Sequence, residues 1–482
     1  MTPRNLRASQ LPTCVLVVFL FAATAFAAGP REKVLHNFQG TPDGANPNSH
    51  LVAGEAGHFY GTTAGGGTGI NCDFAYNDIV ACGTVFELIP PTTPGGSPTE
   101  RVIYSFEGGS DGSSPLGALI VDGKGNLYGT TAFGGGSTNC TTGIQGYYPG
   151  CGTVFRLSPP STSGGEWTES ILHVFQAGED GGEPWGGLIV DAKGNLYGTT
   201  STGGSGYCEG YPGHCGTAFE LSPPSDEGGP WTETILYGFG ASDSDGETPL
   251  STLIFDRKGN LYGTTNAGGT GACSEYSCPG TVFRLTPPAV KGNPWMETVL
   301  FNFSQDAAGG LFPGASLIFD KSGKLYGTTE GGGSGACGPL EYYFYGCGTI
   351  FSLSPPASAG SWTLTTLYSF TGGSDGGYPQ SGLVFDDKGN LYGTAPRGGG
   401  QGSCTEITGI SGVGCGTVYR LTPPAISSGA WTETTLHAFS GGGDGATPYG
   451  SVILRDGILY GTTSGVSNYS AATGGTVFGI VP

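Results

Sequence analysis

Apolar and polar positions follow one another in the same order seven times along the chain. In the second unit a short apolar run, ALIV (118–121), precedes a polar turn and the segment NLYGTT (126–131). GTVFRLSPP (152–160) follows, and then WTESILHVF (167–175), in which apolar and polar residues alternate. The tyrosine of NLYGTT marks the repeat at intervals of 64 to 69 residues: Tyr60, Tyr128, Tyr197, Tyr262, Tyr326, Tyr392 and Tyr460. Self-similarity at such a period is the signature of a repeat architecture.

Each unit predicts four short β-strands. The apolar run is typical of a strand buried on both faces, and a turn such as DAKG, with Gly194 suited to positive φ, joins it to NLYGTT in a hairpin. The proline pair after the third segment stops strand pairing. The fourth segment alternates with period two, so one of its faces is aromatic and the other aliphatic. Helical periodicity is missing from the repeats.

Seven four-stranded units fit a seven-bladed β-propeller or a β-solenoid. The ends of the repeat array favour the propeller. The first strand segment is REKVLHNF (31–38), which corresponds to a fourth strand, and the last is GGTVFGIVP (474–482), which corresponds to a third. We therefore predict an all-β seven-bladed propeller with four antiparallel strands per blade, whose seventh blade is closed by the N-terminal strand.

The first 27 residues predict an export signal. Arg4 and Arg7 precede an apolar run and the small-residue site around Ala27. We expect residues 1–27 to be a signal peptide and residues 28–482 to be one propeller domain, exported to the periplasm, the cell surface or the medium. No later segment is apolar enough to predict insertion into a membrane.

The charge of the mature chain limits its partners. Loss of residues 1–27 would leave 16 basic and 38 acidic side chains, a net charge of about −22. Such a surface repels phosphate backbones, so we do not expect nucleic acid or an anionic membrane as a partner. We expect a monomer.

Twelve cysteines fall as one pair in each of the first six units, between the second and third strands. Metal binding is the alternative, but these loops lack a repeated CxxC or histidine spacing, and an oxidising compartment favours disulfides. The predicted pairs are Cys72–Cys82, Cys140–Cys151, Cys208–Cys215, Cys273–Cys278, Cys337–Cys347 and Cys404–Cys415.

The repeated unit GLIVDAKGNLYGTT, with the GTVFRLSPP and WTESILHVF segments and a DGxxP turn, resembles the GloVer tandem repeat of large exported bacterial proteins. The resemblance covers residues 31–482 and implies no defined activity. More loosely, the DxxGNLY strand pair looks like that of NHL-type and gluconolactonase-type propellers. The metal and catalytic residues of those enzymes have no counterpart here, so we expect no cofactor, no metal and no catalytic residue.

Two repeated polar positions allow a structural and a functional interpretation. The acidic DGxxP turns could form a ring of Ca²⁺ ligands, but one geometry shared by all crossovers favours aspartates that cap their own turns. The histidines in the fourth strand occupy a slot that holds Tyr or Phe in sister units, which favours a packing role. The aspartates are Asp43, Asp111, Asp180, Asp245, Asp375 and Asp444, and the histidines are His36, His173 and His437.

Function is expected where the units differ, and the cysteine loops differ most. Their aromatic residues offer rigid contact area at low entropic cost, although they could simply pack over the mouth of the ring. We predict a binding or scaffold module whose cysteine-loop face contacts a glycan or a protein. The alternative is a propeller-type enzyme, a lyase or lactone hydrolase, with its site in the central funnel. The candidate ligand-binding residues are Phe74, Tyr76, Tyr147, Tyr148, Tyr207, Tyr211, Tyr276, Tyr342, Tyr343, Tyr345 and Trp185, the last on a crossover.

Overall fold

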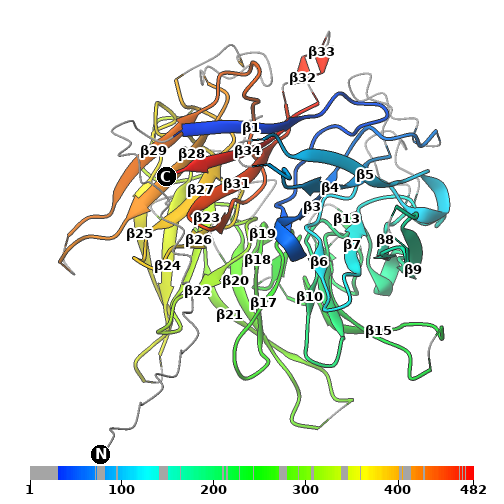
Figure 1. Ribbon diagram of the computed structural model, residues 1–482. Helices are drawn as coiled ribbons and strands as arrows, with labels where there is room; N and C mark the ends of the chain where they lie inside the picture. Colours follow the sequence, from blue (N-terminus) through cyan, green and yellow to red (C-terminus); the bar gives the residue numbers. More distant parts are fainter. Residues whose placement is uncertain are drawn as a thin grey trace, which may run out of the picture.

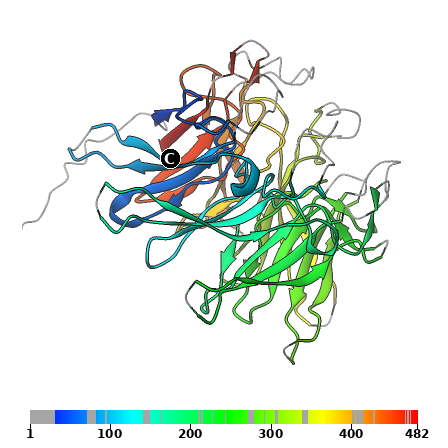
Figure 2. The same cartoon turned by 90° about the vertical axis from the view of Figure 1, so that its right-hand side faces the viewer.

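A computed structural model describes residues 31–482 with gaps at 71, 73–81, 94–95, 141–149, 163, 209–210, 213–214, 227, 243, 271–278, 291, 305–308, 338–345, 359, 401–403, 405–413, 427–428, 466, 469–470 and 473. Within these limits the protein is all-β, with seven four-stranded antiparallel sheets, each forming one blade of a β-propeller. Figure 2 shows blades 1 and 7, in blue and red, on the opposite side of the molecule from blade 4, in green. The predicted fold class is confirmed.

The blades follow the order of the sequence. Blade 1 contains β2 (Val52–Ala53), β3 (Phe59–Thr63), β4 (Thr84–Ile89) and β5 (Thr99–Ser105). Blade 2 contains β6 (Ile120–Val121), β7 (Leu127–Thr131), β8 (Thr153–Ser158) and β9 (Thr168–Val174). Blade 3 contains β10 (Ile189–Val190), β11 (Leu196–Thr200), β14 (Thr217–Ser222) and β15 (Thr232–Gly238). Blade 4 contains β17 (Ile254–Phe255), β18 (Leu261–Thr265), β20 (Thr281–Thr286) and β21 (Met296–Asn302). Blade 5 contains β22 (Ile318–Phe319), β23 (Leu325–Thr329), β24 (Thr349–Ser354) and β25 (Thr363–Ser369). Blade 6 contains β26 (Val384–Phe385), β27 (Leu391–Ala395), β28 (Thr417–Thr422) and β29 (Thr432–Ala438). Blade 7 contains β30 (Ile453–Arg455), β31 (Ile458–Thr463), β34 (Thr476–Val481) and β1 (Arg31–Asn37).

Short elements decorate the loops. Two-stranded ribbons are formed by β12 (Tyr207–Cys208) with β13 (Tyr211–Pro212), β16 (Gly246–Glu247) with β19 (Ala267–Gly268), and β32 (Ser467–Asn468) with β33 (Ala471–Ala472). Single 3-10 turns occur at η1 (Glu55–Gly57), η2 (Gly109–Asp111) and η3 (Gly178–Asp180). In the described ranges no helix is long and apolar enough to cross a membrane.

The ring closes between the two ends of the repeat array. Strand β1 pairs antiparallel with β34, in a register that runs from Arg31 opposite Val481 to Asn37 opposite Thr476. Figure 1 shows β1, in blue, lying beside β34, in red. Blade 7 thus takes three strands from the C-terminal segment and one from the N-terminal segment, as predicted from the sequence.

Aromatic side chains hold neighbouring blades together. The phenylalanine after the fourth strand is fully buried, and its ring meets an aromatic ring in the third strand of the next blade edge-on. Phe175 and Phe219 have centroids 5.2 Å apart. The glycine of NLYGTT makes room for the second ring, because a Cβ at Gly198 would lie 2.6 Å from Phe219 Cζ. The glycine of the repeated motif is therefore explained by the packing of each blade against the next.

The two threonines of NLYGTT have different partners. The first donates its hydroxyl to a carbonyl at the inner edge of the next blade, as Thr199 Oγ1 does to Ser251 O at 3.3 Å. The second bonds within its own blade, as Thr200 Oγ1 does to Thr217 Oγ1 at 2.9 Å. These buried bonds satisfy polar groups around the propeller axis, so they stabilise the ring where its blades are narrowest.

Candidate functional site

The crossovers and the cysteine loops open on the same face of the ring. Strand direction alternates within a blade, so the start of the first strand and the end of the second lie at the same edge. The crossover that leads into β10 and the loop between β11 and β14 therefore share this face. We call it the crossover face, and its centre, where the seven crossovers reach the axis, the axial mouth.

All seven crossovers hold a residue in the left-handed conformation immediately before a proline. Glu183 is typical: its N–H donates to Cys151 O at 2.8 Å, and its carbonyl accepts from Ser201 N at 3.1 Å. Positive φ is unfavourable for branched and aromatic residues, so these bonds must enforce it. The seven residues are Asn46, Ser114, Glu183, Thr248, Phe312, Tyr378 and Thr447, with φ from 51° to 60°. The backbone of the mouth is constant while its side chains vary.

A narrow cavity of about 120 Å³ runs along the axis below this mouth. Each blade lines it with the three residues that follow the crossover proline: 48–50, 116–118, 185–187, 250–252, 314–316, 380–382 and 449–451. A water molecule occupies about 30 Å³ of liquid, so the cavity holds only a few waters. A larger ligand would bind at the mouth and not inside the channel.

His50 occupies the third of these positions, where the other blades have small residues. Burial lowers the pKa of His50 to about 4, so its imidazole is neutral at physiological pH. No hydrogen-bond partner contacts His50 within the part of the chain that the structure describes. A neutral imidazole offers one donor and one acceptor, and here both are available to the contents of the cavity.

Blades 5 to 7 bring a polar cluster to the mouth. Gln380 Nε2 donates to Glu330 Oε1 at 2.7 Å. Burial raises the pKa of Glu330, while the Gln380 hydrogen bond and the charge of Arg397 oppose that rise. The Arg397 guanidinium also lies 5.5 Å from the centroid of the Tyr378 ring and forms a hydrogen bond with Tyr449, whose pKa burial raises. A carboxyl group, a guanidinium cation and a phenol from three blades thus meet beside the axis.

Trp185 stands on another side of the mouth, in blade 3. It is one of the few large apolar residues left exposed, at 41%, and it lines the cavity rim. Its indole forms a hydrogen bond with Glu183, whose pKa burial raises and this bond lowers. An indole face with a carboxylate at its edge is suited to an amphipathic ligand.

Most of the predicted ligand residues lie outside the described part of the chain. These are Phe74, Tyr76, Tyr147, Tyr148, Tyr276, Tyr342, Tyr343 and Tyr345. Tyr207 and Tyr211 belong to the β12–β13 ribbon, where Cys208 pairs with Tyr211. The aromatic rim on the cysteine loops remains a prediction, and Trp185 is the predicted residue that the structure places at the axial mouth.

Five of the six predicted disulfides are confirmed within the described residues, and Cys273 and Cys278 lie outside them. In each pair the second cysteine is buried next to the third strand and beside the phenylalanine that ends the fourth strand. The bonds are Cys72–Cys82, Cys140–Cys151, Cys208–Cys215, Cys337–Cys347 and Cys404–Cys415. These disulfides hold the ends of the variable loops against the blade core.

The aspartates of the DGxxP turns cap those turns, as the structural interpretation proposed. Asp111 Oδ2, for example, accepts from Glu107 N at 2.8 Å. Their second partner was not predicted from the sequence. Each also faces the His or Tyr of the strand before it, as Tyr104 Oη donates to Asp111 at 3.1 Å and to Glu169 of the next blade at 2.9 Å.

We call this set the interblade triad: the His or Tyr of a fourth strand, the Asp of the following turn, and the Glu of the next fourth strand. The six triads are His36–Asp43–Glu100, Tyr104–Asp111–Glu169, His173–Asp180–Glu233, Tyr237–Asp245–Glu297, Tyr368–Asp375–Glu433 and His437–Asp444–Glu32. At the remaining interface, between blades 4 and 5, Phe301 and Leu364 both pack against one apolar cluster. The histidines are therefore more than packing residues, because their Nε2 atoms face carboxylates.

Comparisons with known proteins place the chain by its repeat. The model of the Gloeobacter/Verrucomicrobia repeat matches residues 82–341 and 136–407. A search of curated proteins finds no match to this sequence.

Similar solved structures include three enzymes of low sequence identity. A fungal alcohol oxidase of the AA5 family, in complex with copper, has a TM-score of 0.49 and 13% identity over 94% of this chain and 76% of that one. A putative oxidoreductase (glucose dehydrogenase) from Thermus thermophilus has a TM-score of 0.39 and 17% identity over 76% of this chain and 96% of that one. Trypanosoma rangeli sialidase, in complex with the inhibitor DANA, has a TM-score of 0.39 and 14% identity over 82% of this chain and 57% of that one.

The repeat of seven NLYGTT-like strands with their flanking strands is thus the one that the family model describes, and the chain belongs to the Gloeobacter/Verrucomicrobia repeat family.

Proposed function

We propose that this protein is an exported binding module that holds a glycan at its axial mouth, with Trp185 as the stacking platform. The observation that carries the proposal is the contrast between a constant crossover backbone and variable side chains. Seven crossovers share one strained conformation, yet the residues beside each proline range from Gly314 to Trp185. Residues that differ on a shared frame are free to serve a ligand.

The chemistry of the mouth suits a sugar better than an apolar ligand. The Trp185 indole provides a flat apolar face, and Glu183, Gln380 and Glu330 provide carboxylate and amide groups for hydroxyls. Ligand sites commonly combine an aromatic surface with a few fixed polar groups. The aromatic residues predicted on the cysteine loops would extend this surface outward, and a protein partner that carries glycans would use both.

Export is part of the proposal. Residues 1–27 have the pattern of a signal peptide, and residues 28–482 would be the mature propeller domain. The five disulfides support this, because such bonds form and persist in oxidising compartments.

The test is a glycan array probed with the mature protein, followed by titration of the best glycan. Trp185→Ala should weaken binding about tenfold or more, which corresponds to about 1.4 kcal/mol. Val290→Ala removes another exposed apolar side chain from a loop between third and fourth strands, on the opposite face, and should leave affinity unchanged. Equal affinity of Trp185→Ala and wild type would remove the axial mouth as the site, and no signal on the array would contradict a glycan ligand.

A second function, catalysis in the funnel, is favoured by one specific observation. Glu330, Arg397 and Tyr449 come from three different blades and meet near the axis, with His50 in the cavity below. An enzyme of the lyase or lactone hydrolase type would need such a set of acid and base groups. Turnover of the bound glycan by wild type but not by Glu330→Gln would establish this alternative.

A further inference from the structure

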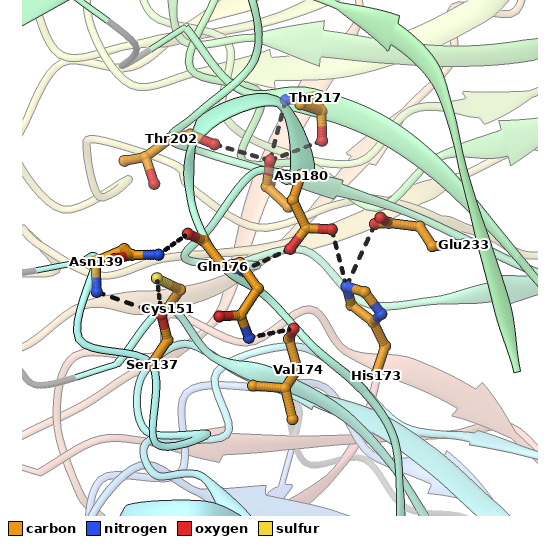
Figure 3. A network of polar contacts seen from close by, with 11 residues as sticks. Ser137, Asn139, Cys151, His173, Val174, Gln176, Asp180, Thr202, Thr217 and Glu233 are labelled. Carbon is orange, nitrogen blue, oxygen red and sulfur yellow. Dashed lines mark hydrogen bonds and ion pairs between the residues drawn. The ribbon is translucent and has the colours of Figure 1, made fainter. Parts of the chain in front are cut away.

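Two of the interblade triads gather three potential metal ligands around one point. Figure 3 shows His173, Asp180 and Glu233 directed toward one another. His173 Nε2 lies 3.1 Å from Asp180 Oδ1 and 3.6 Å from Glu233 Oε1. One nitrogen and two oxygens, one from each residue, lie within 4.8 Å of one another.

The same arrangement recurs where the ring closes. His36 Nε2 lies 3.2 Å from Asp43 Oδ2 and 4.0 Å from Glu100 Oε2, and these residues also offer three ligand atoms within 4.8 Å. His36 lies on β1, the closing strand of blade 7, and Glu100 on β5 of blade 1. This site therefore spans the junction between the first and last blades.

In both sets one buried glutamate oxygen lacks a full hydrogen bond. Glu100 Oε1 and Glu233 Oε1 accept none, and the nearest nitrogen to Glu233 Oε1 is His173 Nε2 at 3.6 Å. The Glu100 side chain is only 8% exposed. A buried carboxylate oxygen with no donor is costly, and two adjacent carboxylates repel each other unless they share a proton. A cation between them would remove both penalties.

The sister triads with tyrosine lack the nitrogen ligand. The hydroxyl of Tyr104 keeps its proton, because burial and the charge of Glu169 raise its pKa, and it donates that proton toward the carboxylates. Histidine at the same position offers a lone pair once its other nitrogen carries the proton. The exchange of Tyr for His thus converts a hydrogen-bonded interface into a ligand set.

We propose that His173–Asp180–Glu233 and His36–Asp43–Glu100 each bind a divalent transition-metal ion such as Zn²⁺. At metal–ligand distances of about 2.0–2.2 Å, neighbouring ligand atoms lie roughly 3.0–3.6 Å apart, close to the spacing around His173. One imidazole with two carboxylates favours Zn²⁺, Mn²⁺ or Fe²⁺ over Ca²⁺, which prefers oxygen ligands alone. His173, Asp180 and Glu233 remain 19%, 22% and 12% exposed, so water can enter to complete the coordination.

The third histidine triad supplies an internal control. His437 Nε2 lies 3.3 Å from Asp444 Oδ2, but Glu32 does not join them within the same 4.8 Å. A His437→Tyr variant changes the same residue type in the same structural position, yet should remove no metal.

The experiment is calorimetric titration of the mature, EDTA-treated protein with Zn²⁺ at neutral pH. We expect two ions per chain for wild type and for His437→Tyr, one for His173→Tyr or His36→Tyr, and none for the double variant. Tyrosine already fills this position in sister blades, so the variants should fold, and equal metal-free melting temperatures would verify it. Zn²⁺ should raise the melting temperature of wild type but not of the double variant.

The opposite result is equally clear. Zn²⁺ binding that is undiminished in the double variant would locate the ions on other surface carboxylates. A wild-type protein that takes up no Zn²⁺ would show that a shared proton, and not a metal, fills these triads. Visible d–d bands of bound Co²⁺, lost in the double variant, provide a second readout that reports the histidine nitrogen directly.

Discussion

The interblade triads predict that the propeller weakens as pH rises. Their glutamates lie between blades beside an aspartate, and burial, mostly reinforced by that neighbouring negative charge, raises the pKa of every one: Glu32, Glu100, Glu169, Glu233, Glu297 and Glu433. A raised pKa in the folded state means that folding favours the protonated acid. The resulting stabilisation is complete below the ordinary value of 4.5 and is lost as pH rises through the raised value.

The stability lost on ionisation is clearest for the two triads with Tyr104 and Tyr237, because neither is a proposed metal site. Burial and the charge of Asp245 raise the pKa of Glu297 to about 8, and burial and Asp111 raise that of Glu169 to about 7. A difference of one unit between the folded and unfolded pKa corresponds to about 1.4 kcal/mol. Full ionisation in the folded state therefore costs up to about 5 kcal/mol at Glu297 and about 3.5 kcal/mol at Glu169, and water that enters a loosened interface reduces both values.

Urea unfolding in EDTA at pH 5, 7 and 9 measures this cost. The wild-type midpoint should fall steeply between pH 5 and 9. The double variant Glu169→Gln, Glu297→Gln carries neutral side chains of the same shape. Its free energy of unfolding should therefore fall by several kcal/mol less than that of wild type between pH 5 and 9. Glu166→Gln, an exposed residue near the same strand, should follow wild type. A double variant as sensitive to alkali as wild type would refute the assignment of protonated glutamates to the blade interfaces.

Two further predictions test the blade interfaces and the disulfide bonds. Leu364→Glu places a carboxyl against the apolar cluster between blades 4 and 5, and should lower the free energy of unfolding by about 2 kcal/mol. Leu364→Met should lower it by less than about 1.5 kcal/mol, and equal urea midpoints for the two variants would contradict the apolar interface. Replacing Cys140 and Cys151 with serine opens a short loop and should cost on the order of 2 kcal/mol, measured by thermal unfolding against wild type under non-reducing conditions, and an unchanged melting temperature would show that the bond constrains little.

The blades and their closure could be predicted because their signals are local. A strand of NLYGTT carries its own apolar pattern, its glycine and its two threonines, and each feature repeats until chance is excluded. Ring closure followed from counting strands, since β1 and the C-terminal three complete one blade. The cysteine pairs were readable for the same reason: each pair lies within a single loop.

The interblade triads could not be assembled in this way, because their members come from different units. His173 and Glu233 are sixty residues apart and meet only after two blades pack. One signal was nevertheless present in the sequence. The unit with Phe301 in place of His or Tyr is followed by the unit with Leu364 in place of Glu, and it also has a disrupted DGxxP turn. Such joint replacement marks side chains that share one interface, and it would have separated these positions from ordinary packing sites.

Trp185 and a funnel site were predicted, but the polar residues of the axial mouth could not be assembled from the sequence for a related reason. Seven blades place equivalent positions on one circle, so residues far apart in sequence, such as His50 and Tyr449, become neighbours at its centre. A residue shared by all units is explained by the blade structure that every unit forms. A residue found in one unit alone is not explained in this way. His50 is such a residue, because the other blades have a small residue there, and so is Trp185, where sister blades have Leu, Asn, Gly, Gln or Tyr. The blade does not require these two residues, and together they lie at the one place that all seven blades share.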